Sequence, residues 1–204
     1  ARRHGVEVHP MDVNASDWDC TLEVTRRRDQ IDWSLRLGWR MLNGVSQSIA
    51  ETIVRCRQTG RFTSYDEFVQ RTRFSPTTLA LLSDADAFRS VGESRRTAFW
   101  KSLPAQEPAE LYEDEVNPEP VASLPAMTSE QQVIADYRTS GLSLRHHPIS
   151  FMRGELTRRR VLRSDELLTV EPDRRYRVAG LVPLRQPPST AKGITFMTLE
   201  DEAG

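Results

Sequence analysis

The apolar positions in the first half of the chain recur at helical spacing. One helix face is formed by Ile49, Ala50, Ile53 and Val54. Gly60 stands where a glycine would end this helix, and Asn43-Gly44 separates the helix from a short apolar stretch over residues 38–42. The pattern therefore predicts a helix that ends before Gly60 and is preceded by a tight turn.

Two further helix starts are marked by capping residues. Ser64-Tyr65-Asp66-Glu67 has the Ser-x-x-Glu pattern of a capping box, which predicts a helix through about Arg71. The dipeptide Ser75-Pro76 combines an N-cap residue with proline at the first helical position, where the missing amide hydrogen would have no partner. Leu79 and Leu82 are predicted to form the apolar face of this helix.

A last helix of this half is predicted from about Ser94 to Leu103, with Ala98, Phe99 and Leu103 as its apolar residues. Residues 1–30 differ, since they are predicted to form an extended polar segment. Within it, Val6-Glu7-Val8 alternates like a short strand, and the residues from Asp12 to Ser16 are turn-like. The part that follows is expected to be all-helical, a small bundle with connections of a few residues.

The composition changes over residues 104–127, which hold five prolines and the acidic cluster Glu113-Asp114-Glu115. Such a segment is predicted to be an extended, self-repelling linker. Beyond it, a capping box at residues 128–131 opens a helix that ends near Gly141. Another helical stretch is predicted over residues 150–160.

Towards residue 204 the apolar period changes from helical to strand-like. Residues 176–183 alternate between two faces, and residues 194–199 form a second strand, joined to the first through residues 187–193. An isolated two-stranded hairpin is marginally stable in water, so this sheet is expected to be cut short here or to pack on the preceding helices. The fold class predicted is mainly α with a small β part.

The 204 residues are 38% hydrophobic and 28% charged, a composition typical of a soluble protein with a modest core. No apolar run approaches the roughly 18 residues of a membrane span, and residues 1–5 lack the apolar stretch of a signal peptide. A cytoplasmic location without membrane contact is therefore expected. Cys20 and Cys56 form no CxxC pattern, and His146-His147 has no second ligand pair at a suitable spacing, so neither disulfides nor a metal site are expected.

The net charge of −1 hides an uneven distribution. Residues 1–103 carry a net charge of +3, residues 104–136 of −8 and residues 137–204 of +4. Two mildly basic parts therefore flank an acidic connector, which keeps nucleic acid among the partners to consider.

The segment from Met41 to Ile53 has the pattern of a helix-hairpin-helix motif: an aliphatic residue, a glycine-aliphatic hairpin, and alanine and isoleucine at later positions. Gly44 allows the backbone to turn, and Val45 would insert between the two helices. The amides of residues 46–48 would then lie free at a helix N-terminus, where a phosphate oxygen can accept their hydrogens. Such a site holds the sugar-phosphate backbone and recognises no base.

Ser46 departs from this motif, which prefers a second glycine at that position. Serine is a good N-cap residue, so the turn is expected to survive, while the closest approach of a phosphate is left open. The residues predicted to contact DNA here are Asn43, Gly44, Val45, Ser46, Gln47 and Ser48, with the arginines Arg40, Arg55 and Arg57; Arg61 is also near. The alternative is an ordinary helical turn with an Asn-Gly break.

Several other segments carry a family resemblance. They are Val6 to Pro10, Asp12 to Asn14, Leu37-Gly38, Ser83 to Phe88, Asp136 to Arg138, Gly141 to Leu144, His147-Pro148, Arg153, Val178 to Val182, Arg185-Gln186, Thr190 to Gly193 and Phe196 to Asp201. Through them the chain resembles the region after the fingers in bacterial polymerase III alpha subunits, and the last segments resemble the error-prone, damage-inducible branch of that family. The resemblance is weakest over residues 104–127.

This resemblance implies a domain order. Residues 1–30 would come from the upstream fingers region, residues 31–103 would form a tandem helix-hairpin-helix domain, and residues 104–127 the acidic linker. A helical bridge would follow over residues 128–170, and residues 171–204 would be the first strands of an OB-fold. Polymerisation in the family uses acidic residues that hold metal ions, Mg²⁺ by expectation, in an upstream palm domain. No catalytic residue, cofactor or metal is therefore assigned to this chain.

OB-fold strands bind single-stranded nucleic acid by stacking and charge. The candidates for such contacts are Arg177, Arg185 and Lys192, with Phe196, although an apolar strand residue such as Phe196 also suits a core.

The family resemblance also implies a role in translesion synthesis and damage-induced mutagenesis, with recruitment by an adaptor, an inactive Y-family-like protein. A peptide for the sliding clamp would need closely spaced glutamine, aliphatic and aromatic residues. Gln106 is separated from Leu111-Tyr112 by four residues, so clamp contact is expected to be indirect. Two alternatives stay open: a protein-interaction module that docks the adaptor without touching DNA, and a stand-alone repair protein with a hairpin-and-OB layout.

Overall fold

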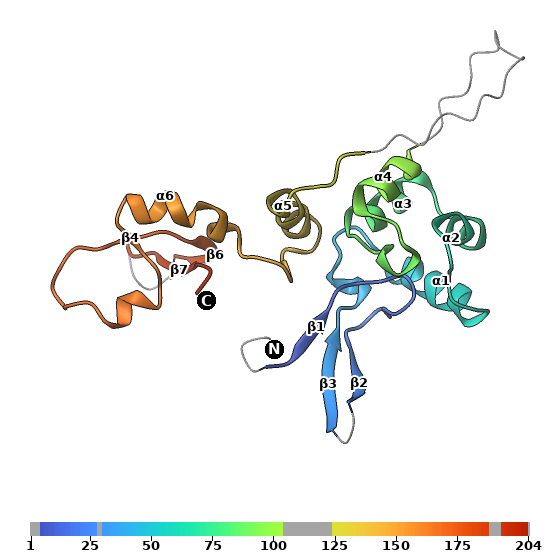
Figure 1. Ribbon diagram of the computed structural model, residues 1–204, viewed down its shortest axis with the longest axis horizontal. Coiled ribbons are helices and arrows are strands. Elements are labelled where there is room, and N and C mark those ends of the chain that lie inside the picture. The colour runs from blue at the N-terminus through green and yellow to red at the C-terminus, as the bar shows by residue number, and fades with distance from the viewer. Residues whose placement is uncertain (1–4, 28–29, 104–123, 188–192, 204) are drawn as a thin grey trace, which may run out of the picture. The chain divides into compact units, whose positions relative to one another are not determined.

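The computed structural model of the protein describes residues 5–27, 30–103, 124–187 and 193–203, the side chains of residues 25–31 excepted. The chain divides into two compact units. The helical unit comprises Ala1–Thr128 and Ala135–Leu144, and the C-terminal unit comprises Ser129–Ile134 and Arg145–Gly204. The described residues are mainly helical with small β parts, which confirms the predicted fold class (Figure 1). The domain boundaries given above stay predictions.

The α-helices in the first part of the helical unit are α1 (Gln47–Gln58), α2 (Tyr65–Thr72), α3 (Pro76–Asp84) and α4 (Arg95–Ser102). Each begins after a serine whose hydroxyl accepts an amide hydrogen three residues further on: Ser46, Ser64, Ser75 and Ser94. The predicted helix starts at residues 64 and 75 are thus confirmed. The Glu67 carboxylate accepts hydrogen bonds from the hydroxyl and amide of Thr63 and from Arg71, and these bonds lower its pKa to about 2.

An aromatic cluster lies at the centre of the helical unit. Phe68 is fully buried, and its ring centroid lies 4.9 Å from that of Phe62, 5.0 Å from that of Phe88 and 5.9 Å from that of Phe74. Trp39 is also fully buried in the same core. Close, tilted ring pairs of this kind stabilise a core beyond the burial of their area.

The helix faces follow the prediction in α3 but only in part in α4. The residues predicted to face the core from α3 are buried: Leu79 and Leu82. In α4, Ala98 is buried, whereas Phe99 and Leu103 are 40% and 45% exposed. The inward face of α4 instead follows Arg95, Ala98 and Ser102 at helical spacing. Polar residues therefore occupy inward positions that hydrophobicity alone does not reveal.

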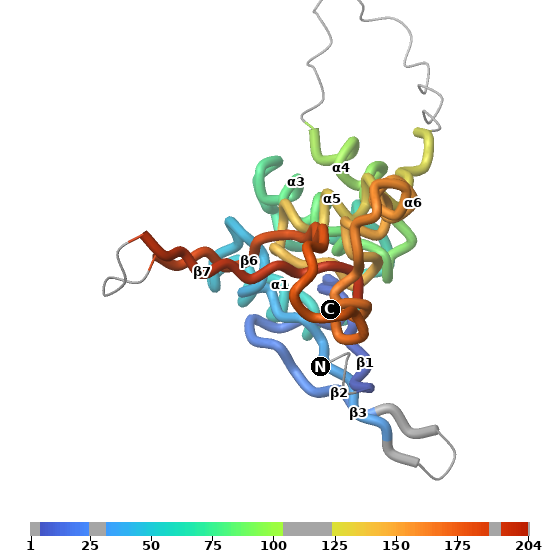
Figure 2. The backbone as a smooth tube through the Cα atoms, turned by 90° about the vertical axis from the view of Figure 1, so that its left-hand side faces the viewer, coloured from blue at the N-terminus to red at the C-terminus, as the bar shows by residue number. Residues whose placement is uncertain are grey.

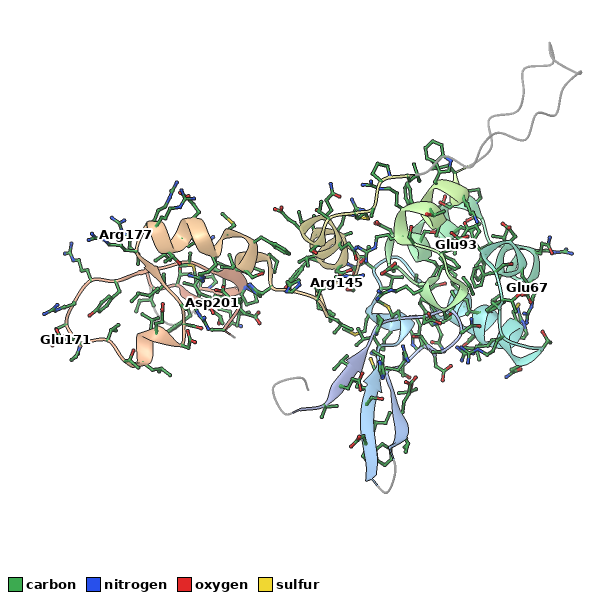
Figure 3. All side chains as sticks on the ribbon, viewed as in Figure 1. Glu67, Glu93, Arg145, Glu171, Arg177 and Asp201 are labelled. Carbon is green, nitrogen blue, oxygen red and sulfur yellow. The ribbon has the colours of Figure 1, made fainter. Side chains whose placement is uncertain are left out.

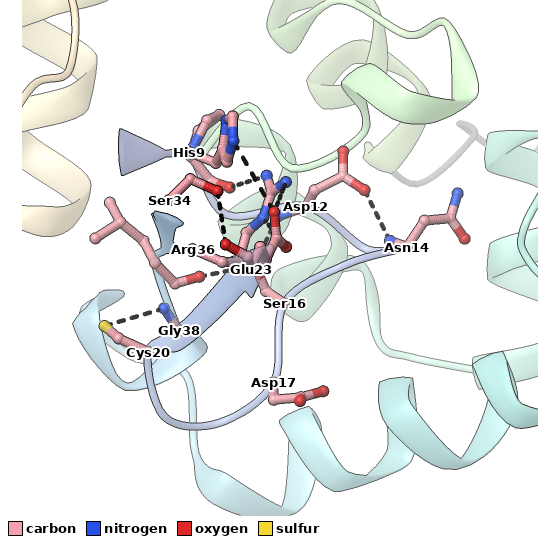
Figure 4. Close-up of polar contacts among 12 residues, drawn as sticks. His9, Asp12, Asn14, Ser16, Asp17, Cys20, Glu23, Ser34, Arg36 and Gly38 are labelled. Atoms are coloured by element: carbon pink, nitrogen blue, oxygen red, sulfur yellow. Dashed lines mark hydrogen bonds and ion pairs between the residues drawn. The ribbon is translucent and has the colours of Figure 1, made fainter. Parts of the chain in front are cut away.

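Residues 11–17 form a turn packed into the helical unit, which confirms the turn expected over residues 12–16 but not the extended, polar character expected for residues 1–30 as a whole (Figure 4). The Asp12 carboxylate accepts hydrogen bonds from the amide of Asn14 at 2.8 Å and from the amide and hydroxyl of Ser90 at 3.1 and 2.6 Å. The Asn14 side chain exchanges two hydrogen bonds with the backbone of Phe62, at 2.9 and 2.8 Å. These bonds join the connection between α1 and α2 to η3 (Arg89–Val91), which lies between α3 and α4.

A three-stranded sheet precedes the helices (Figure 1). Its order is β1 (Glu7–His9), β3 (Gln30–Arg36) and β2 (Thr21–Arg27), with β1 parallel and β2 antiparallel to β3. β1 confirms the strand predicted near residues 6–8. The expectation that the chain is all-helical after residue 30 is wrong, because β3 continues to residue 36. Asp32, Ser34 and Arg36 alternate there with Trp33 and Leu35, which is a strand pattern with one polar face.

The two faces of this sheet differ in chemistry. On one face, Arg36 forms two parallel hydrogen bonds with the Glu23 carboxylate, at 2.8 and 2.9 Å, and these bonds lower the pKa of Glu23 (Figure 4). On the other face, Leu22, Val24 and Trp33 are 65%, 49% and 57% exposed. We call these three residues the apolar sheet face.

The helix α5 (Ser129–Ser140) confirms the helix predicted to end near Gly141. In the C-terminal unit, η4 (Pro148–Met152) and α6 (Arg153–Arg158) confirm the helical stretch predicted over residues 150–160. The remaining elements are β4 (Val161–Leu162), η5 (Glu166–Leu168), β5 (Arg177–Val178), β6 (Leu181–Gln186) and β7 (Phe196–Glu200).

The strand predicted over residues 176–183 is in fact two strands. β5 pairs in parallel with β4, whereas β6 pairs antiparallel with β7, and the latter pair is visible as neighbouring segments in Figure 2. The break falls at Gly180, where a Cβ atom would lie 2.7 Å from the carbonyl oxygen of Glu200. This close backbone approach requires glycine, which explains why simple alternation failed at this position.

Candidate nucleic-acid interface

The turn between η2 (Trp39–Met41) and α1 forms the predicted hairpin, and we call residues 43–48 the hairpin tip. Gly44 has a φ of +85°, a conformation that strains any residue with a Cβ atom. A Cβ atom there would make only an ordinary contact, 3.4 Å from Leu81 Cδ1, so the dihedral rather than lack of space favours glycine. Val45 is buried in the core beneath the turn, as its predicted insertion between helices requires. Its side chain is therefore not available to DNA.

Ser46 occupies the position at which the motif prefers a second glycine, and its geometry shows why serine fits. Its φ of −89° and ψ of 159° are extended values that any residue adopts. Its hydroxyl accepts the amide hydrogen of Ile49 at 3.4 Å and lies 2.8 Å from the hydroxyl of Ser48. The turn is thus maintained, and Ser46 caps α1.

The hairpin tip presents backbone amides to solvent. Gly44, Ser46, Gln47 and Ser48 are exposed, and their amides donate no hydrogen bond to any residue that the structure describes. The Asn43 amide differs, because it donates to the carbonyl oxygen of Thr139 in α5 at 2.9 Å. Of Asn43, only the exposed side chain is therefore available to contact a phosphate. Amides at the positive end of a helix dipole suit a phosphate oxygen.

The arginines predicted to assist the tip are of two kinds. Arg57 donates to the carbonyl oxygen of Ser16 at 3.0 Å and pairs with Asp17 at 2.5 Å. It is held by the fold, which removes it from the predicted interface. Arg40 is exposed and pairs with the exposed Asp19 at 2.6 Å. Exposed pairs contribute only about 0–1 kcal/mol, so Arg40 is able to exchange this partner for a phosphate.

The charge around the hairpin tip is nearly balanced. Arg55 is exposed on α1 and contacts the Thr52 hydroxyl at 3.3 Å, on the helix face that also carries Ser48. Glu51 is exposed as well and accepts a hydrogen bond from the Gln47 side chain at 2.9 Å. Binding of an anion at the tip therefore depends mainly on the amides, with few cations to assist them.

The residues predicted to contact single-stranded nucleic acid on an OB-fold are not brought together. Arg185 pairs across the hairpin with Met197, while Phe196 pairs with Gln186, so the Arg185 and Phe196 side chains lie on opposite faces of β6 and β7. Arg177 belongs to the other small sheet. Lys192 lies outside the described residues.

The helix start predicted at Ser94 is confirmed, since Ser94 precedes α4 and accepts the Thr97 amide hydrogen at 3.2 Å. The amides of Gly92 and Glu93 before it donate to the carbonyl oxygens of Arg89 and Phe88. One feature of possible ligand contact was missed in the sequence. In the C-terminal unit a cavity is lined largely by arginines. The run Arg158-Arg159-Arg160 was the available signal for that cavity.

Acidic residues of the kind that serve as metal ligands are engaged by other side chains. Asp84 accepts two hydrogen bonds from Arg138, at 2.6 and 2.7 Å. Asp201 accepts the amide and hydroxyl hydrogens of Ser164, both at 2.7 Å. Throughout the described residues no group of three or more His, Cys, Asp or Glu side chains could hold a metal ion. Among the same residues, no helix has the length and apolarity needed to cross a membrane.

Comparison with known families agrees with this geometry. Residues 5–98 match the family described as "Helix-hairpin-helix motif". The match covers the three-stranded sheet, the hairpin tip, α1 to α3 and the first half of α4. The fold and the tip thus define a helix-hairpin-helix motif in this part of the chain.

Curated relatives are similar to the chain over its entire length. The error-prone DNA polymerases of Sinorhizobium medicae, Methylococcus capsulatus and Caulobacter vibrioides are 41%, 40% and 41% identical to it. Each match covers 100% of this chain but only 20%, 21% and 21% of the relative. Over its whole length the chain is thus similar to one segment of error-prone DNA polymerases, which confirms the resemblance seen in the sequence. It spans about a fifth of the length of these relatives.

Proposed function

We propose that this chain is a DNA-binding and recruitment segment of an error-prone DNA polymerase that acts in translesion synthesis and damage-induced mutagenesis. The hairpin tip holds the sugar-phosphate backbone of duplex DNA and recognises no base. Nucleotide addition, with its Mg²⁺ ions, belongs to other parts of the polymerase. The observation that carries this proposal is the row of exposed amides at Gly44 and residues 46–48, within a match to the helix-hairpin-helix family.

The energetics of such a tip are set by hydrogen bonds to a charged acceptor. A hydrogen bond to a charged group contributes about 1.5–3 kcal/mol net, and the helix dipole adds about 0.3–1 kcal/mol. The nearly balanced charge around the tip adds little long-range attraction. We therefore expect modest affinity for duplex DNA, with a salt dependence that corresponds to a few phosphate contacts.

The test is a titration of a fluorescent duplex with the whole chain at about 50 mM and about 200 mM salt, read by anisotropy. Gly44→Val should weaken binding strongly, because a β-branched residue does not accept a φ of +85°. Gly60→Val is the matched control, since Gly60 also has a positive φ, +136°, but lies at the opposite end of α1. Equal affinities of the two variants, or binding that ignores salt, would contradict the proposal.

A second candidate function is favoured by the apolar sheet face. Leu22, Val24 and Trp33 are exposed together, and the hairpin tip is not strongly basic. In this function the segment docks an adaptor, an inactive Y-family-like protein, without touching DNA, and any contact with the sliding clamp is indirect. Three results together would favour this candidate over the first. The chain would capture the adaptor, Trp33→Glu would abolish that capture, and duplex DNA would give no change in anisotropy.

A further inference from the structure

The C-terminal unit contains an open cavity of about 610 Å³ between the end of α6, β4 and β5. Its lining residues are Arg158, Arg159, Arg160, Leu162, Val170, Arg175, Tyr176 and Arg177. We call it the arginine cavity. The lining holds five arginines and no acidic side chain, and the volume is within the range of about 300–1,000 Å³ typical of ligand pockets. Figure 3 labels Arg177 in this unit.

The cations of the arginine cavity are only partly neutralised. Arg158 and Arg159 share the single carboxylate of Glu155, at 2.5 and 2.7 Å. Arg160 and Arg175 are exposed and form no ion pair with any described residue. Five like charges around one cavity repel one another, and a bound anion removes that repulsion.

Backbone contacts hold this cluster in place. β4 and β5 pair in parallel, with Val161 opposite Arg177. The Arg177 guanidinium donates to the carbonyl oxygen of Arg159 at 3.3 Å, which links β5 to the end of α6. The arginines are therefore presented by paired elements rather than by a free coil.

Arg160 occupies a conformation that its side chain does not favour. Its φ is +57°, and its amide donates to the carbonyl oxygen of Thr157 at 2.9 Å, so it ends α6 in the position usually held by glycine. A residue with a Cβ atom is strained there. Glycine would therefore suit this backbone position better than arginine does.

The cavity also has an aromatic and an apolar part. Tyr176 is 38% exposed, and its hydroxyl donates to the carbonyl oxygen of Glu171 at 3.1 Å, which fixes the end of the side chain. Leu162 and Val170 are half-buried beside it. An exposed ring held among arginines is the combination with which proteins bind single strands, because any base stacks on it while phosphates meet the cations.

We propose that the arginine cavity binds the backbone of single-stranded DNA, with phosphates on Arg160, Arg175 and Arg177 and one base stacked on Tyr176. This site is separate in residues from the hairpin tip and does not depend on it. It also differs from the strand faces of β6 and β7, on which Arg185 and Phe196 diverge.

The test uses the whole chain and a fluorescent oligothymidylate, with anisotropy as the readout. The variant Arg160→Gly/Arg175→Ala removes two cations, and glycine suits the backbone at residue 160, so the fold should be retained. We expect the salt slope of log K to fall by about 0.7 for each phosphate that no longer meets a cation. The control is Arg174→Ala, since Arg174 is exposed, pairs with Glu171 at 2.7 Å and does not line the cavity.

Tyr176→Ala should weaken oligothymidylate binding about tenfold, whereas Tyr176→Phe should keep the stacking and most of the affinity. An excess of thymidine triphosphate distinguishes a strand from a free nucleotide as the source of the phosphate. Displacement of the oligonucleotide only at high nucleotide concentration supports the strand. Tight nucleotide binding without oligonucleotide binding, or identical weakening in the Arg174 control and the double variant, overturns the proposal. Duplex binding by the Gly44→Val variant is measured in parallel. Loss of duplex binding at the hairpin tip can then be distinguished from loss of single-strand binding at the arginine cavity.

Discussion

Gln47→Pro offers a way to delete one amide from the hairpin tip while leaving the helix intact. Gln47 is the first residue of α1, and its amide donates no hydrogen bond to a described residue. Proline is favoured at this helix position because the amide it lacks is not needed there. Ser46, which would precede the proline, already has the extended conformation that such a residue requires.

The expected weakening follows from the bond removed. If the Gln47 amide donates to a phosphate, its deletion costs about 1.5–3 kcal/mol, which is about tenfold to a hundredfold in the dissociation constant for duplex DNA. The free energy of unfolding should change by less than about 1 kcal/mol, and it should rise if proline restricts the unfolded chain. Urea unfolding and duplex anisotropy, measured on the same preparations, give the two quantities.

Gln47→Ala is the matched control, because it also removes the side-chain hydrogen bond to Glu51 but keeps the amide. The proline variant should bind duplex DNA at least tenfold more weakly than the alanine variant. Equal affinities for the two would show that this amide meets no phosphate, and the amide-based account of the tip would then fail.

Three further predictions concern the fold. The pKa of Glu67, about 2 against 4.5 for the free group, means that its stabilising contribution is complete above about pH 4.5 and is lost as the pH falls towards 2; Glu67→Gln should flatten this acid loss in urea unfolding curves. Asn14→Ala leaves the buried amide of Phe62 without its acceptor and should cost about 1–3 kcal/mol, whereas Asn43→Ala, at an exposed side chain, should cost little in thermal unfolding. Gly180→Ala places a Cβ atom 2.7 Å from a Glu200 backbone oxygen and should separate β6 from β7, detected as faster proteolysis there; unchanged proteolysis would refute the close approach.

Helix positions and caps were predictable because they depend on neighbours in sequence. The starts at Ser64 and Ser75 and the glycine turn before α1 each follow from a few consecutive residues. The β2–β3 hairpin was missed although its strands are adjacent in sequence, because one of its faces is apolar yet exposed. The pairing of β3 with β1 was missed because it spans more than twenty residues. Pairing over such a distance leaves no local signal.

The residues of the candidate sites also differ in whether they could be predicted from nearby sequence. The turn at Gly44 and the cap at Ser46 could be inferred from residue types, whereas the engagement of Arg57 with Ser16 and Asp17 could not, since those partners lie about forty residues away in sequence. The arginine cavity likewise joins residues 158–160 to residues 175–177 through the pairing of β4 with β5. A basic run in sequence does not reveal which aromatic side chain it will surround.

The bonds from Asp12 and Asn14 to Ser90 and Phe62 have a mechanical consequence. They hold the connection after α1 against η3, and through it against the turn that precedes α4. Two helix pairs that are separate in sequence, α1 with α2 and α3 with α4, are thereby joined by buried polar bonds as well as by the apolar core. Asn14→Ala removes the bonds to Phe62 and should let the two pairs move more freely relative to each other.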